Sequence, residues 1–271
     1  MIIRKGARRR VEIPGEVLEA LNGGVIATVN LVESLAVDQG VLLRAVAEEI
    51  GLVEKLDGDG RARMEALVSG IWDLSFTARM REIGEFLYSV IDGSERGGEI
   101  LERLAGHGSD MVRSWVPFVN GFDDGLSLEA RFARVRRFAA DGHFGVREWA
   151  WIAVRPAMAS ELERGIGLLE ESWVGDDDAN VRRFAIEITR PRGVWCKHIG
   201  ALKERPEMVL SLLERVRSDG SKYVRDSVGN WLNDAGKTQP EWVREVCARW
   251  EKESKTKETA YIVKRGLRNL F

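Results

Sequence analysis

The fold of this chain is decided by two segments that align residue for residue, FGVREWAWIAVRP at residues 144–156 and ANVRRFAIEITRP at residues 179–191. Each follows a turn, carries the pair Val-Arg at the same place and ends on Arg-Pro. The pair recurs at Val112-Arg113 and at Val224-Arg225, so the four copies lie 34, 35 and 43 residues apart. A period of this length is typical of helical repeat arrays.

Within the copies, apolar and small residues recur at three- and four-residue intervals, as Val146, Trp149 and Ala150 do. This spacing places them on one face of a helix that packs against the next repeat, and the proline is expected to end the helix. The sequence therefore predicts an all-α fold, a right-handed α-solenoid of HEAT-like helical repeats. We place the repeats in residues 101–271, and a helical region continuous with the array in residues 1–100.

Composition excludes several other classes of protein. Hydrophobic residues make up 44% of the 271-residue chain and charged residues 31%, which is typical of a globular protein. No stretch approaches the roughly 20 apolar residues that cross a bilayer. Cys196, Cys247 and three scattered histidines form neither a disulfide framework nor a metal site. We expect a cytoplasmic protein that binds no metal.

The overall charge of −2 conceals an asymmetry along the chain. Residues 181–271 hold 20 Lys and Arg against 12 Asp and Glu, whereas residues 1–180 hold 21 against 31. The first set has a net charge of +8 and the second −10, so the basic end is the candidate for a polyanion-binding surface. Solvation of the outer faces of helices explains such a composition equally well.

Longer motifs around the repeats carry a family resemblance. They comprise residues 144–150, 180–185, 189–192 with Trp195, and 223–234, followed in order by Lys237, Pro240, Trp250 and residues 261–268. Together they resemble the DNA alkylation repair family, the AlkC and AlkD glycosylases, and they are more similar to the AlkC branch. The resemblance covers about residues 100–271. AlkD-type members have a tryptophan in the final motif where this chain has Asn230 with Trp231 beside it.

This resemblance implies hydrolysis of the N-glycosidic bond of cationic alkylated purines, such as 3-methyladenine or 7-methylguanine, in double-stranded DNA. The transition state of such a reaction needs a negative group near the positive charge that spreads onto the sugar, and it needs a positioned water. The family places its catalytic carboxylate one repeat before the second Arg of an Arg-Arg pair. Counting back from Arg183 leads to Glu148, which we predict to be catalytic.

The resemblance implies neither a metal nor an organic cofactor, and we expect a monomer that lies at the nucleoid when it binds DNA. It also implies two sets of binding residues. Residues predicted to contact the base or sugar are Trp149, Trp151, Trp195, Asn230, Trp231 and Asp234. Residues predicted to bind the DNA backbone are Arg147, Arg182, Arg183, Arg190, Arg192, Arg225, Lys237, Lys264 and Arg268.

Other interpretations of these residues stay open at the level of the sequence. Trp149 and Trp231 have the spacing of core residues, and the helix dipole also favours an acid at Glu148. Arg182 and Arg225 are equally explained as partners of Asp178 or Asp226, and Glu187 is spaced to pair with Arg183. For the whole protein, the alternative to a glycosylase is a non-catalytic HEAT-like scaffold that binds DNA or a protein partner.

Overall fold

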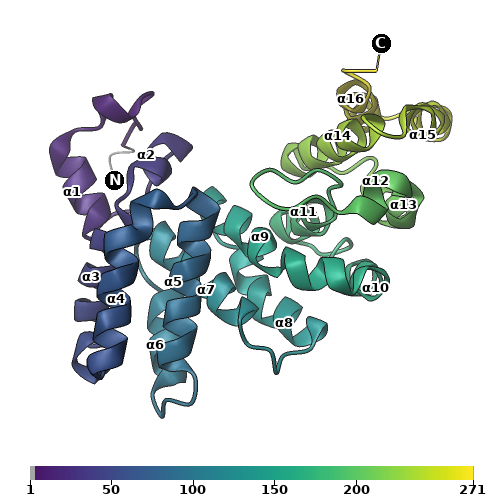
Figure 1. The fold of residues 1–271 in the computed structure, drawn as a ribbon. Helices are drawn as coiled ribbons and strands as arrows, with labels where there is room; N and C mark the ends of the chain where they lie inside the picture. The colour runs from purple at the N-terminus through teal and green to yellow at the C-terminus, as the bar shows by residue number, and fades with distance from the viewer. Residues whose placement is uncertain (1–3, 271) are drawn as a thin grey trace. The chain divides into compact units, whose positions relative to one another are not determined.

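The computed structural model describes residues 4–270, and this part of the chain contains helices and no strand (Figure 1). The predicted all-α fold of HEAT-like helical repeats is confirmed. The chain divides into two compact units. The N-terminal unit comprises Met1–Leu126 with Gly142–Ala153, and the C-terminal unit comprises Ser127–Asp141 with Val154–Phe271. None of the helices in residues 4–270 is long and apolar enough to span a bilayer. The boundary near residue 100 stays a prediction.

The N-terminal unit is built from neighbouring helices that contact in chain order. α3 packs against α4, α4 against α5, and α5 runs along α7 with α6 beside both. Its elements are η1 (Arg10–Glu12), α1 (Gly15–Asn22), α2 (Leu31–Ala36), α3 (Gln39–Glu49), η2 (Val53–Lys55), α4 (Gly58–Gly70), η3 (Ile71–Asp73), α5 (Phe76–Ile91), α6 (Gly97–Ala105), α7 (Asp110–Gly121) and the first part of α9 (Phe144–Ser160).

The C-terminal unit repeats the same arrangement. α14 contacts both α11 and α16, and α15 packs against α14 and α16 (Figure 1). Its elements are α8 (Leu128–Ala139), the remainder of α9, α10 (Leu162–Ser172), α11 (Ala179–Ile188), α12 (Gly200–Glu204), η4 (Pro206–Val209), α13 (Leu210–Arg215), α14 (Lys222–Gly236), α15 (Pro240–Glu253) and α16 (Lys257–Gly266).

The four Val-Arg pairs lie near the starts of α7, α9, α11 and α14. Their valines are buried, with exposed fractions between 0% and 2%. The residues three and four places further on are buried as well; in the second copy these are Trp149 at 2% and Ala150 at 0%. The predicted apolar helix face is therefore confirmed as core.

The arginines of these pairs close the turns that precede their own helices. In three copies the guanidinium donates to the carbonyl oxygens six and five residues earlier in the chain, which precede the helix and lack a helical partner. The bonds run from Arg113 to His107 (2.7 Å) and Gly108 (3.1 Å), from Arg182 to Asp176 (2.8 Å) and Asp177 (3.0 Å), and from Arg225 to Asp219 (2.8 Å) and Gly220 (2.7 Å).

The two Arg-Pro pairs differ in what the proline does. Pro191 lies just beyond α11, as predicted, but Pro156 lies inside α9, which continues to Ser160. The prediction that Pro156 ends its helix is therefore wrong. A proline within a helix removes one backbone donor and disturbs the preceding turn, and the surrounding packing can retain the helix despite that penalty.

The close approach of α5 and α7 yields a stability prediction. A Cβ atom at Gly84 would lie 2.4 Å from the Cβ of Phe118, whereas a Cβ at Gly98 in α6 would have no neighbour within 4 Å. We expect Gly84→Ala to lower the free energy of unfolding by about 1–3 kcal/mol through overpacking. The control Gly98→Ala should leave it unchanged or raise it by up to about 1 kcal/mol. Chemical denaturation measures both, and equal effects of the two variants would contradict the packing argument.

Candidate functional site

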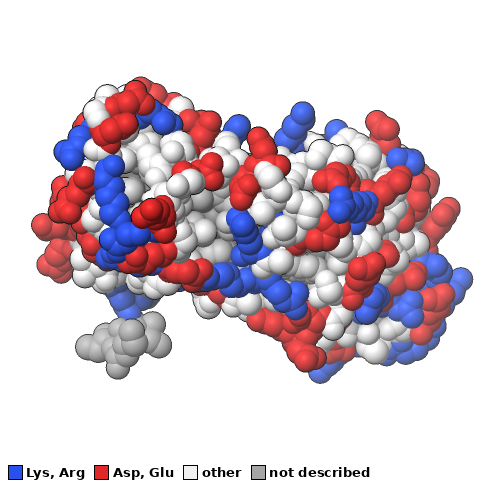
Figure 2. Space-filling model, turned by 90° about the horizontal axis from the view of Figure 1, so that it is seen from below, with Lys and Arg blue, Asp and Glu red and all other residues white. Residues whose placement is uncertain are grey.

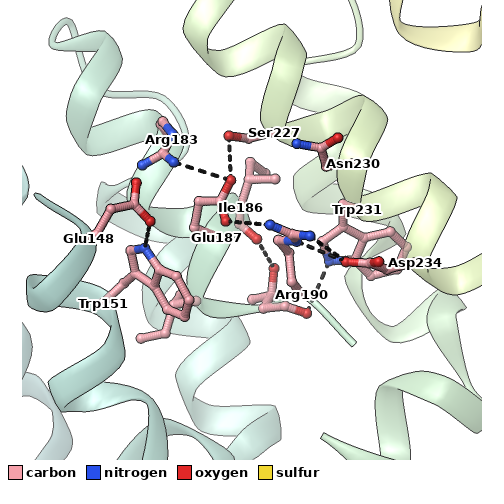
Figure 3. A network of polar contacts seen from close by, with 12 residues as sticks. Glu148, Trp151, Arg183, Ile186, Glu187, Arg190, Ser227, Asn230, Trp231 and Asp234 are labelled. Atoms are coloured by element: carbon pink, nitrogen blue, oxygen red, sulfur yellow. Dashed lines mark hydrogen bonds and ion pairs between the residues drawn. The ribbon is translucent and has the colours of Figure 1, made fainter. Parts of the chain in front are cut away.

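Glu148 lies one turn into α9, in the N-terminal unit, and its side chain is half-buried. Its Oε2 atom accepts a hydrogen bond from the indole nitrogen of Trp151 at 3.0 Å, which orients the carboxylate (Figure 3). The indole of Trp151 is 2% exposed and its position is set by the core. The carboxylate predicted to be catalytic is thus attached to a rigid support.

Trp149, on the next position of α9, belongs to the core of the same unit. It is 2% exposed, and the centroid of its ring lies 5.0 Å from the ring centroid of Phe76 and 5.9 Å from that of Phe118. In this conformation Trp149 and Trp151 present no substantial ring surface to solvent. Their contact with a base or a sugar remains a prediction.

In the C-terminal unit, α11 and α14 are joined by a buried ionic network (Figure 3). Glu187 of α11 lies 3.4 Å from Arg183 and 3.1 Å from Arg190, and its Oε1 accepts a hydrogen bond from Ser227 of α14 at 2.6 Å. The pairing of Glu187 with Arg183 is the one expected from their spacing, and it is confirmed. Arg183 also lies over the ring of Tyr223, 4.1 Å from its centroid.

The network continues into α14 through Asp234. Its carboxylate accepts two hydrogen bonds from Arg190, at 2.6 and 2.9 Å, and pairs with Lys237 at 3.1 Å. Trp231, one turn earlier, is fully buried and donates to the carbonyl oxygen of Thr189 at 3.0 Å. Asp234 and Trp231, predicted to contact the base or sugar, therefore hold the end of α11 against α14.

Charges inside the network decide the protonation of Glu187. Burial by itself would raise the pKa of this carboxyl, but the adjacent charges of Arg183 and Arg190, with hydrogen bonds from Ser227 and Arg190, outweigh burial and hold the pKa below its ordinary value. Glu187 is therefore an anion at neutral pH. Burial by itself would lower the pKa of Arg190, but the charges of Glu187 and Asp234 and the hydrogen bonds to both carboxylates outweigh burial and raise it, so the charged form of Arg190 is favoured.

The arginines of the Val-Arg pairs are also engaged. Beyond its bonds to the preceding turn, Arg182 forms a two-bond ion pair with Asp219, at 2.7 and 2.9 Å, rather than with Asp178. Arg225 lies 5.7 Å from the ring centroid of Tyr261, while Asp226 pairs with Lys222 at 2.7 Å. Arg147 is half-buried near the start of α9. Binding of these arginines to a DNA backbone stays a prediction.

One predicted aromatic residue differs from the others, because Trp195 lies on the loop after α11 and is 44% exposed. Its backbone is in the left-handed region, with a φ of 61°, and the neighbouring Val194 is 54% exposed. The base of the loop is fixed by Arg155, which is 2% exposed and donates to the carbonyl oxygens of Ile188, Arg190 and Lys197.

The remaining predicted polar residues lie nearer to solvent. Lys237, Lys264 and Arg268 are exposed, whereas Arg192 and Asn230 are half-buried. Asn230 accepts hydrogen bonds from Arg265 and Arg268, both at 3.2 Å. On the face drawn in Figure 2, acidic and basic side chains are interspersed rather than separated. Within residues 4–270 there is no group of three or more His, Cys, Asp and Glu side chains arranged to hold a metal ion.

Sequence reasoning missed three residues that build this region. Arg155 fixes the Trp195 loop, Ser227 bonds to Glu187, and Asp219 pairs with Arg182. A signal for Asp219 was present, because it precedes Arg225 by six residues as Asp176 precedes Arg182. A signal for Arg155 was present as well, because Arg155 and Arg190 occupy the same position of the two aligned segments, each before a proline.

The lowered pKa of Glu187 gives a prediction about acid stability. Its ion pairs contribute stability above the ordinary pKa of 4.5, and that contribution is lost as the pH falls through the lower pKa of the folded protein. We expect Glu187→Gln to cost about 3 kcal/mol at neutral pH, because two arginines lose their buried partner. The cost should shrink at about pH 3. Urea unfolding at both pH values measures it, with exposed Glu245→Gln as control; a cost that does not change with pH would contradict the assignment.

Residues 146–270 match the model of the DNA alkylation repair enzyme family. The uncharacterized protein YhaZ of Bacillus subtilis is 42% identical over 119 residues, which are 44% of this chain and 32% of that relative. The Pseudomonas fluorescens alkylpurine DNA glycosylase AlkC, bound to DNA containing an abasic site analog, is 30% identical with a TM-score of 0.69, over 84% of this chain and 62% of its own.

AlkD2 from Streptococcus mutans shares the fold, at 19% identity and a TM-score of 0.57, over 76% of this chain and 98% of its own. The present chain spans about a third of YhaZ and 62% of the AlkC chain. The likeness to AlkC is stronger than that to AlkD2 in both identity and TM-score, in agreement with the resemblance of the motifs. Residues 146–270 therefore match the DNA alkylation repair family, and the fold of the chain is similar to that of the helical-repeat proteins AlkC and AlkD2.

Proposed function

We propose that this protein is a DNA glycosylase of base excision repair, which hydrolyses the N-glycosidic bond of cationic alkylated purines such as 3-methyladenine or 7-methylguanine in double-stranded DNA. The observation that carries the proposal is the likeness to the alkylpurine glycosylase AlkC, which extends over 84% of this chain at 30% identity. We further propose that the protein acts as a monomer in the cytoplasm, at the nucleoid when it is bound to DNA.

Glu148 is the proposed catalytic residue, and its surroundings support that role. A cationic base is a good leaving group, so the main requirement is a negative charge close to the sugar as positive charge develops there. The hydrogen bond from Trp151 fixes the orientation of the Glu148 carboxylate before DNA binds. Such preorganisation avoids part of the reorganisation that a mobile carboxylate would require in the transition state.

Among the proposed base- and sugar-contacting residues, Trp195 has the exposure that stacking requires. An indole ring attracts a cationic base by roughly 0.5–2 kcal/mol, depending on how much water is excluded. The proposed backbone contacts include the exposed cations of the same unit, which are Lys237, Lys264 and Arg268, together with Arg192. Phosphate contacts of this kind position the DNA and make its affinity dependent on salt.

A second candidate function is a non-catalytic scaffold that binds DNA or a protein partner. The observation that favours it is the burial of Trp149, Trp151 and Trp231, which places three of the predicted base- and sugar-contacting residues in the core. The two functions separate in one assay. Release of methylated bases from alkylated duplex supports the glycosylase, whereas DNA binding without release supports the scaffold.

The proposal predicts a specific loss of activity in Glu148→Gln. The amide keeps an oxygen that accepts the Trp151 hydrogen bond, but it removes the negative charge that stabilises the developing cation. We expect excision of methylated purines to fall by about 100-fold or more, with duplex binding retained. Glu163→Gln, at an exposed acid on α10, is the matched control and should excise at the wild-type rate. Full activity in Glu148→Gln would exclude this residue as the catalytic group.

A second prediction concerns Trp195. Trp195→Ala should weaken binding to duplex that carries a methylated purine by about 3- to 30-fold, because the ring face is lost. Binding to undamaged duplex should change less. Val194→Ala alters the neighbouring exposed residue of the same loop and serves as the control. Equal affinity losses of Trp195→Ala on damaged and undamaged duplex would show that the indole does not recognise the cationic base.

A further inference from the structure

The first described residues form a basic segment, Arg4-Lys5-Gly6-Ala7-Arg8-Arg9-Arg10. It contains five cationic residues and no Asp or Glu, although residues 1–180 as a whole carry a net charge of −10. None of these residues belongs to the network or to the exposed cations already described. The segment is therefore a local exception to the net negative charge of residues 1–180.

Side-chain bonds attach the start of this segment to the N-terminal unit. Arg4 donates to both carboxylate oxygens of the buried Glu33, at 2.5 and 2.9 Å, and to the carbonyl oxygen of Ala27 at 2.9 Å. The side chain of Asn30 donates to the carbonyl oxygen of Ala7 at 2.9 Å. Gly6 packs so closely that a Cβ atom there would lie 2.3 Å from Nδ2 of Asn30. The segment is anchored, so little additional ordering is needed when a ligand binds.

The three consecutive arginines that follow the anchor are exposed. Arg9 pairs with Glu12 at 2.6 Å, with side chains that are 76% and 38% exposed, and such surface pairs exchange readily for another anion. Neither Arg8 nor Arg10 has an acid within ion-pair distance in the part of the chain that the structure describes. The positive charge of the segment is therefore directed to solvent.

Arg10 extends this charge to a second element. Its guanidinium lies 5.2 Å from the ring centroid of Trp72, while that of Arg79 lies 4.2 Å from the same centroid. Trp72 is 39% exposed, and its indole nitrogen donates to Asp38 at 3.1 Å. Partial burial, and next the charge of Arg10, lower the pKa of Arg79, whereas Asp38 opposes them. The two guanidinium groups over this ring repel each other, and a bound anion would relieve that repulsion.

We propose that Arg8, Arg9 and Arg10, with Arg79 beside Trp72, form a second nucleic-acid contact that binds phosphates of duplex DNA regardless of sequence. The inference rests on the proposed function for the identity of the polyanion. Arginine outnumbers lysine four to one in the segment, and the planar guanidinium binds phosphate through two parallel hydrogen bonds. This contact would add to the phosphate contacts proposed for the exposed cations of the C-terminal unit.

The test is the salt dependence of binding to a short undamaged duplex, measured by fluorescence anisotropy from about 50 to about 200 mM NaCl. We expect the triple variant Arg8→Gln, Arg9→Gln, Arg10→Gln to reduce the slope of log affinity against log salt by about 2–3. At the upper salt concentration the affinity should fall at least about tenfold. The three side chains are exposed, so circular dichroism should show an unchanged helical fold.

The matched control is the triple variant Lys55→Gln, Arg63→Gln, Arg96→Gln, which removes the same charge from exposed positions of the same unit. Its slope should be close to that of the wild type. Equal slopes for both triple variants, or an unchanged slope for the arginine variant, would overturn the proposal. So would a loss of binding to vesicles of anionic phospholipid with no change on DNA, which would assign the segment to a membrane surface.

Measuring duplex binding and base release together distinguishes a failure of this proposal from a failure of the proposed glycosylase function. A wild type that binds duplex through these arginines but releases no methylated base supports the segment and contradicts the glycosylase. A wild type that excises bases while the triple variant keeps the full salt slope supports the glycosylase and contradicts the segment. A wild type that binds no duplex at low salt contradicts both.

Discussion

Guanidinium groups that bond inward hold the C-terminal unit together. Arg155 satisfies carbonyl groups at the end of α11 and in the loop after it, and Arg182 closes the turn before that helix. Arg190 joins α11 to α14 through Glu187 and Asp234. Arginine suits this work because its planar group presents five donors and keeps its charge even when buried. The position of α14 against α11 thus depends on ion pairs as well as on apolar packing.

Because several arginines form ion pairs inside the unit, the net charge counted along the sequence does not measure the charge at the surface. Residues 181–271 carry a net charge of +8, yet Arg182, Arg183 and Arg190 direct their charge to buried or half-buried carboxylates. Positive charge that is neutralised inside the unit contributes little to a surface potential. The interspersed acidic and basic side chains in Figure 2 agree with that view. Affinity for a polyanion therefore depends on where the remaining cations lie rather than on their number.

The sequence predicted the parts of the structure that repeat or lie one helical turn apart. The buried face of the repeats follows from their spacing, and the Arg183 to Glu187 pair follows from i to i+4 geometry. The contact between Arg190 and Asp234 had no such signal, because these residues are 44 positions apart and do not occupy equivalent places in the repeats. The prediction for Pro156 is wrong because it rests on the local tendency of proline to end a helix, which tertiary packing overrides in α9.

The tryptophans show why the candidate site was harder to predict than the fold. A tryptophan at helical spacing, such as Trp231, fits a core pattern as well as a binding pattern, and its burial is what assigns it to the core. Trp195 lies on a loop and is exposed. The left-handed backbone of Trp195 costs about 1–3 kcal/mol, and such strain persists only where neighbouring groups determine the conformation. Arg155 holds the base of the loop, and Gly193 packs so closely that a Cβ there would lie 2.3 Å from the sulfur of Cys196. The loop backbone that carries the exposed indole is therefore fixed by contacts within the unit, which would lower the entropic cost of the stacking proposed for Trp195.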